Sequence, residues 1–246
     1  GAGMQTTVKT GGLGDSGATQ VQSFADPRFV AKQVVAVHVD SDDADSVRSA
    51  LAACVKALSI SNVKTVLVSV HALQLKRSSA NGRDWSQALV GAIEQGSYLY
   101  TTSKSTTVGK PFTARVTICA DDALALAPEF AVAKAVASGV AVAKEWANRP
   151  ANLSTPTHLG EQAKAMGKLR NMQVQVMGPR EVAKLKMGSF MAVAQGSTEP
   201  LRFIVMQYKG APQTQAPVVL VGKGITFDTG GISIKPSPDM DEMKYD

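Results

Sequence analysis

The sequence predicts an α/β protein built from two successive units, and three observations carry this prediction. Apolar β-branched runs alternate with segments of helical periodicity, a pattern typical of a layered structure with a mostly parallel sheet. The alternation stops at Pro150, which ends a long alanine-rich helix, and then begins again. A chain of 246 residues is also long enough for one large core or two modest ones. We therefore expect a non-catalytic α/β domain over residues 27–147 and the start of a second α/β domain over residues 148–246.

The chain begins with a segment of different composition. Residues 1–26 are rich in Gly, Ser, Thr and Gln, and they lack a sustained apolar period. Such a composition is typical of a mobile tail. We therefore predict a flexible tail over residues 1–26, with no strand before the Gly-Gly-Leu-Gly run at residues 11–14.

The first domain is expected to alternate strands with helices. Ser41 is a predicted helix cap, since it is followed by Asp42, Asp43 and Asp45, whose charges favour a helix start. One apolar face of that helix consists of Val47, Leu51, Cys54, Val55 and Leu58. The expected strands of this domain are residues 33–39, 63–71 and 111–119, and its further helices are residues 84–99 and 123–147.

The second domain repeats the alternation. Helices are expected over residues 157–168 and 179–185, and strands over residues 173–177, 201–208 and 217–221. Across both domains, the three histidines, Trp85 and Trp146 lie on the expected strands and helices or at their ends, and we expect structural roles for them.

Composition narrows the functional classes. The net charge of +6 is spread evenly over the chain, so a nucleic-acid partner is possible but no basic arm supports it. Lys134 and Lys144 bracket only nine uncharged residues, whereas a membrane span needs about 20. Cys54 and Cys119 lie in apolar segments and cannot form a disulfide framework. These features predict a cytoplasmic protein without a membrane partner.

The segment with the most chemical information is residues 218–246. An apolar run ends at Val221 and leads into a glycine-rich loop that contains Lys223 and Asp228. Open α/β sheets bind ligands beyond the carboxyl ends of their strands, where this loop would lie. A single lysine or aspartate in such a loop is more often solvated than catalytic, so the spacing of several such residues has to carry the interpretation.

That spacing resembles a known family. The sequence Val-Gly-Lys-Gly-Ile-Thr-Phe-Asp-Thr-Gly-Gly over residues 221–231, followed by Ser-Ile-Lys-Pro over residues 233–236, is similar to the metal-binding motif of the leucyl aminopeptidase family. The similarity continues through Met-Asp-Glu-Met-Lys-Tyr-Asp at residues 240–246, and it includes Asn-Arg-Pro-Ala-Asn at residues 148–152. Before residue 148 the similarity is architectural only.

The resemblance implies a role for each matching residue. Lys223 and Asp246 would bind one divalent metal ion, and Asp228 would bridge two such ions, zinc or manganese. Lys235 would be the catalytic lysine that stabilises the negative charge on the scissile carbonyl. Met243 would line the pocket for the first side chain of the substrate, and the substrate itself would also meet Lys223, Asp228 and Lys235. The family further implies peptide substrates with a free amino terminus, a homo-hexamer and a bound bicarbonate.

The residue types suit these roles. Two divalent ions can activate a water molecule and hold the peptide carbonyl. A lysine binds metal only as the neutral amine, although its unperturbed pKa is about 10.4, and a neighbouring dication favours loss of the proton. Lys235, which is not a ligand, is expected to keep its charge and face the developing oxyanion. One neutral and one charged lysine are therefore expected side by side.

One part of the family pattern is missing. The Asn-Thr-Asp-Ala-Glu-Gly-Arg run, which supplies further metal ligands and the bicarbonate site, occurs nowhere in these 246 residues. We therefore expect this polypeptide to be the amino-terminal portion of an aminopeptidase with a leucine-like preference, and to be inactive alone. The alternative is a non-enzymatic binding module for nucleic acid or protein, built on the first domain.

Overall fold

The computed structural model describes residues 6–9, 20–24, 34–37, 43–59, 63–69, 79–106, 109, 111–119 and 123–245. The chain divides into two compact units, Gly1–Lys144 and Glu145–Asp246. The division lies in the last turn of helix α3 (Ala123–Asn148). The second unit thus begins three residues before residue 148, where the second domain was expected to begin.

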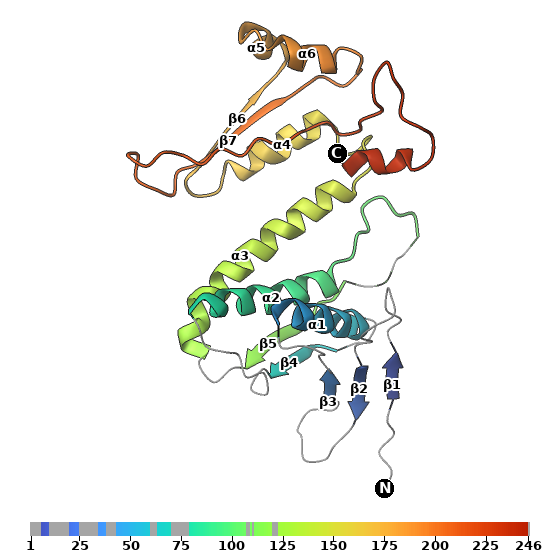
Figure 1. Cartoon of the computed structure of the whole chain (residues 1–246), viewed down its shortest axis with the longest axis vertical. Helices are drawn as coiled ribbons and strands as arrows, with labels where there is room; N and C mark the ends of the chain where they lie inside the picture. Colours follow the sequence, from blue (N-terminus) through green and yellow to red (C-terminus); the bar gives the residue numbers. More distant parts are fainter. Residues whose placement is uncertain are drawn as a thin grey trace. The chain divides into compact units, whose positions relative to one another are not determined.

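The first unit contains two sheets of opposite character (Figure 1). β1 (Thr6–Lys9), β2 (Gln20–Phe24) and β3 (Val34–Val37) form an antiparallel sheet, whereas β4 (Thr65–Ser69) and β5 (Arg115–Cys119) pair in parallel. The α/β class is thus confirmed, with parallel pairing at β4–β5. β1 and β2 both lie within residues 1–26, so the prediction that no strand precedes residues 11–14 was wrong.

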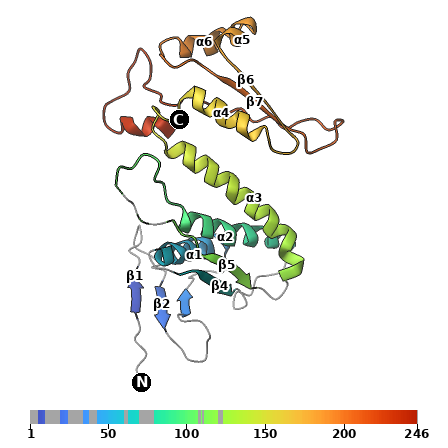
Figure 2. The ribbon, with the colours of Figure 1, turned by 180° about the vertical axis from the view of Figure 1, so that it is seen from behind.

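Two helices form the core of the first unit. α1 (Ala44–Ser59) and α2 (Ser79–Ser97) lie side by side in both views of the ribbon (Figures 1 and 2). Gly96 permits this close approach, since a Cβ at that position would lie 2.5 Å from the carbonyl oxygen of Ala52. Val47, Trp85 and Leu89 are buried together between them.

Parts of the sheet and of α3 complete that core. Partly buried side chains from α1, β4, β5 and α3 pack against the Val47–Trp85–Leu89 cluster: Leu51, Val68, Ile118 and Phe130. The expected apolar face of α1 is therefore confirmed. Its start differs from the prediction: the carboxylate of Asp43 accepts the backbone N–H of Ser46 at 2.8 Å and caps the helix, whereas Ser41 lies outside the described residues.

Helix α3 is long and mostly exposed. By length and composition alone, the segment 124–148 could cross a membrane, and its mean hydropathy is 1.4. We expected no segment of that length because uncharged runs, such as the one between Lys134 and Lys144, are short. A helix that carries a few charges also meets the criterion, so this expectation was wrong. One such helix is weak support for a membrane span, because helices of other kinds meet the same criterion.

The second unit is organised around a hairpin. β6 (Met172–Met177) and β7 (Phe203–Tyr208) pair antiparallel, and α4 (Pro156–Met166) lies against one face through Gly160 and Gly167, where added Cβ atoms would touch Val176 and Val174. Thr155 caps α4 by accepting the backbone N–H of His158. α5 (Pro179–Lys184) and α6 (Gly188–Ala194) follow β6, and α6 reaches β7 through the Phe190–Phe203 ring contact.

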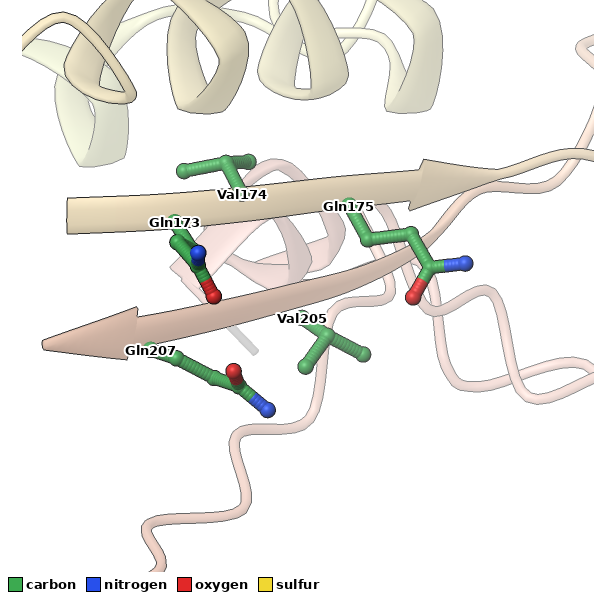
Figure 3. A pocket seen from close by; sticks show the side chains of 5 residues that line it. All are labelled: Gln173, Val174, Gln175, Val205 and Gln207. Carbon is green, nitrogen blue, oxygen red and sulfur yellow. The ribbon is translucent and has the colours of Figure 1, made fainter. Parts of the chain in front are cut away.

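The other face of the hairpin carries a shallow hollow. Figure 3 shows four side chains that line it, Gln173, Gln175, Val205 and Gln207; Val174 also borders it, although its side chain points toward α4. Its volume is about 370 Å³. None of the residues expected to carry chemistry lines it.

The strand expected over residues 217–221 does not form, and that prediction was wrong for this structure. Val218, Val219, Leu220 and Val221 are between 75% and 94% exposed. An extended run becomes a strand only when a neighbour supplies ladder hydrogen bonds, and no described strand lies beside this run. The apolar pattern was real, but the described chain offers it no partner.

Candidate metal and lysine site

The glycine-rich loop after Val221 folds back on itself without regular structure until the 3₁₀ helix η1 (Met240–Tyr245). Two backbone hydrogen bonds fix its shape. The amide of Asp228 donates to the carbonyl of Met243 at 3.2 Å, and the amide of Lys235 donates to the carbonyl of Thr229 at 2.9 Å. These bonds bring three of the five expected site residues into one neighbourhood.

Both expected lysines meet one carboxylate. The Nζ atom of Lys223 lies 3.0 Å from Oδ2 of Asp228, and the Nζ atom of Lys235 lies 3.6 Å from the same oxygen. The other carboxylate oxygen accepts the backbone N–H of Gly230 at 2.9 Å. The three side chains remain partly open to solvent, with exposed fractions of 48% for Lys223, 26% for Asp228 and 34% for Lys235.

These contacts set the charge state of the carboxylate. The hydrogen bond from Lys223 lowers the pKa of Asp228 most, followed by the backbone hydrogen bond from Gly230, and the charge of Lys235 acts in the same direction. The pKa of Asp228 therefore lies far below its ordinary value. Asp228 is ionised at neutral pH, as a metal ligand must be.

Gly230 shapes the loop at the point where the carboxylate is held. Its φ is +93°, a conformation that favours glycine. A Cβ there would also lie 3.1 Å from Cγ of Lys235 and would collide with the carbonyl of Ser233. The glycine thus allows the backbone to donate to Asp228 while Lys235 passes close by.

Met243 contacts the site in an unexpected way. Its thioether sulfur accepts a hydrogen bond from the ammonium of Lys235 at 3.0 Å, while its carbonyl binds the amide of Asp228. The expected role of Met243 was to line a substrate pocket. Sequence reasoning missed its contacts with Lys235 and Asp228, because nothing in a methionine's identity indicates such contacts.

The donor set suits a divalent cation in part. Asp228 offers carboxylate oxygen and Lys223 a nitrogen, which are donor types that zinc and manganese accept. Asp246 lies outside the described residues, and the described part of the chain holds no group of three His, Cys, Asp or Glu side chains that could bind a metal. Two of the described residues, Lys223 and Asp228, could therefore offer donors to such an ion.

The Asn-Arg-Pro-Ala-Asn motif forms the turn between α3 and α4. The guanidinium of Arg149 binds the Glu145 carboxylate at 3.0 and 3.1 Å and lies 4.1 Å above the ring of Trp146. His158 packs 4.7 Å from the same ring and lies 3.4 Å from Arg149. The structural roles expected for Trp146 and His158 agree with these contacts.

Comparisons with known proteins agree with this picture. The catalytic-domain model of the cytosol aminopeptidase family matches residues 141–246. The probable cytosol aminopeptidase of Acidovorax ebreus (strain TPSY) is 48% identical over 239 residues, which are 97% of this chain and 47% of that protein. The corresponding protein of Variovorax paradoxus (strain S110) is 45% identical over 242 residues, with coverages of 97% and 46%.

A solved structure is similar as well. The bottromycin maturation enzyme BotP in complex with Mn superposes with a TM-score of 0.71 at 25% identity, covering 92% of this chain and 47% of that one. Fold and matches together define the class as an α/β protein of a peptidase family. The chain matches the cytosol aminopeptidase family over residues 141–246, which confirms the resemblance drawn from the sequence. It spans about half the length of the curated relatives that it matches.

Proposed function

We propose that this chain contributes to a metal-dependent aminopeptidase that removes amino-terminal residues, leucine-like ones preferred, from peptides. The observation that carries the proposal is the convergence of Lys223 and Lys235 on the Asp228 carboxylate, within the segment that the family model matches. Such a reaction needs a carboxylate and an amine to hold a metal ion, and a charged lysine to stabilise negative charge.

In this proposal Asp228 and Lys223 would hold divalent metal, with Asp246 as a further ligand and with Asp228 shared between two ions. A metal ion bound there would supply Lewis-acid polarisation of the peptide carbonyl and a more acidic water molecule. Lys223 donates to Asp228, and it would bind a metal ion only as the neutral amine. Loss of one proton from its ammonium would therefore accompany metal binding, which low pH would oppose.

Lys235 would act on the substrate. It lies farther from Asp228 than Lys223 does, 3.6 against 3.0 Å, and its ammonium is shared with the soft sulfur of Met243. It can therefore turn toward a carbonyl oxygen that gains negative charge, as an oxyanion-stabilising donor does. Met243 would lie beside the first side chain of the substrate, next to Lys235.

Other parts of the proposal rest on the family resemblance. They are a homo-hexameric assembly, a cytoplasmic location, zinc or manganese as the metal, and a bicarbonate that assists the reaction. The second acidic cluster of the family would have to be present for a two-metal site to close, so we propose that residues 1–246 alone are inactive.

A hydrolysis assay of the complete protein with a leucyl chromogenic amide and added Mn²⁺ tests the function. Asp228→Asn should abolish detectable hydrolysis and weaken Mn²⁺ binding by more than about 100-fold, because loss of a direct ligand should exceed the effect of losing an outer-shell partner. Asp241→Asn, which changes an exposed carboxylate of η1, is the matched control and should hydrolyse normally.

Two results would contradict the proposal. One is hydrolysis by Asp228→Asn at the rate of the unaltered protein. The other is salt-sensitive retention on duplex DNA by a complete protein that hydrolyses nothing, which would favour the binding-module alternative.

A further inference from the structure

The short helix η1 touches the site at two points, both through Met243. The carbonyl of Met243 accepts the amide of Asp228, and its sulfur accepts the ammonium of Lys235. Any shift of η1 would therefore move the carboxylate and the catalytic lysine together. A helix of six residues has little stability of its own, so something outside it must hold it in place.

The next residue provides such an anchor. The ammonium of Lys244 donates to the backbone carbonyl of Asn148 at 3.4 Å and lies 4.8 Å from the ring of Tyr245. Asn148 is the last residue of α3. The carboxyl end of a helix carries partial negative charge, and cations are favourable there. This contact joins residues that are 96 positions apart.

The anchoring point is itself held firmly. Immediately after Asn148, the Arg149 guanidinium is fixed on Glu145 and Trp146. The carbonyl of Pro150 then accepts the amides of Leu153 and Ser154, both at 2.9 Å. The Asn-Arg-Pro-Ala-Asn motif thus offers a rigid carbonyl to Lys244.

We propose that Lys244 is a positioning residue for the site: by holding η1 on the carbonyl of Asn148, it places Met243 so that Asp228 and Lys235 are correctly oriented. The functional importance of this position rests on the proposed function, whereas the contacts of Lys244 and Met243 do not depend on it. The proposal also assigns a role to the motif at residues 148–152, because this motif supplies the backbone carbonyl that binds Lys244.

Hydrogen exchange of the Asp228 amide tests the inference, because that amide is bound by Met243 and its exchange requires no catalysis. The complete, metal-free protein is compared with Lys244→Met, Lys244→Arg and the control Lys168→Met, which removes an exposed lysine that lies elsewhere in the unit. Lys244→Met should speed exchange of the Asp228 amide about fivefold, the effect expected for one partly exposed hydrogen bond. Lys244→Arg keeps a cation at the helix end and should restore the rate to within about twofold.

The outcomes are distinct. Unchanged exchange in Lys244→Met, failure of Lys244→Arg to restore protection, or equal acceleration in Lys168→Met would each overturn the positioning role. A general loss of stability is recognised by faster exchange at the amides of β6 and β7 as well, and it too would overturn the role. Failure of the proposed function would instead show in the hydrolysis assay, while the exchange result would stand by itself.

Discussion

The two regions that matter most in this molecule are stabilised by different means. In the first unit, Val47, Trp85 and Leu89 are at most 8% exposed and pack between two helices. In the loop of the second unit, the lysines and Asp228 are a quarter to a half exposed and are held by hydrogen bonds and ion pairs. The comparison teaches that stability and chemistry are separable here, so each should be open to change without the other.

The largest expected effect breaks the first region. Leu89→Ala should lower the free energy of unfolding by about 2–5 kcal/mol, because Leu89 is 2% exposed and its loss leaves a cavity. Leu124→Ala, at a side chain that is 93% exposed, should change it by less than about 0.5 kcal/mol. Urea unfolding measures both. Mn²⁺ affinity of folded Leu89→Ala should be unchanged, and a parallel loss would show that the regions are not separable.

The next effect breaks the second region alone. In the complete protein, Lys235→Ala should lower kcat by about 10²- to 10³-fold, the usual result of removing one donor to an oxyanion. Bound metal should stay near the unaltered level, since Lys235 is not a proposed ligand. Steady-state kinetics and metal analysis measure the two quantities, with Lys168→Ala as the control; equal loss of metal and turnover would contradict the role assigned to Lys235.

A smaller effect sharpens the comparison within the loop. Gly230→Ala places a side chain at a φ of +93° and against Lys235, and it should weaken Mn²⁺ binding about tenfold by displacing the amide that binds Asp228. Gly224→Ala meets no atom within 4 Å and should bind as the unaltered protein does. Titration calorimetry measures both affinities. Equal affinities for the two variants would show that the turn does not shape the site.

The smallest expected effect concerns pH. Because the folded pKa of Asp228 is lowered from 3.8, its ionised form stabilises the fold above that pH, and this contribution is lost as the pH falls through the lower folded value. The unfolding midpoint of the unaltered protein should exceed that of Asp228→Asn at neutral pH, and the difference should shrink below pH 3.8. The difference should be small, since partly exposed ion pairs are screened. A difference that grows on acidification would contradict the direction of the shift.

Local sequence patterns predicted the helices well and the loop chemistry in outline. The apolar face of α1 and the spacing of Lys223, Asp228 and Lys235 both describe residues that lie near one another along the chain, and the structure brings each set together. Periodicity and motif spacing contain this kind of information.

The errors concern contacts that depend on distant partners. β1 and β2 have few apolar residues, and they are strands because β1 pairs with β2 and β2 pairs with β3. The run 217–221 has the opposite character, with the composition of a strand but no described neighbour. The contact of Lys244 with Asn148 spans 96 positions, and no local pattern indicates it.

The exposed run Val218–Val221 has a practical consequence for handling the protein. Four consecutive β-branched or aliphatic residues without charge, open to water, form the type of segment through which separate molecules associate into cross-β aggregates. Pro217 on one side and Lys223 on the other are residues of the kind that limit such stacking. Concentrated samples should therefore precipitate first through this segment, and a charge introduced at Val219 should raise the concentration at which they remain clear.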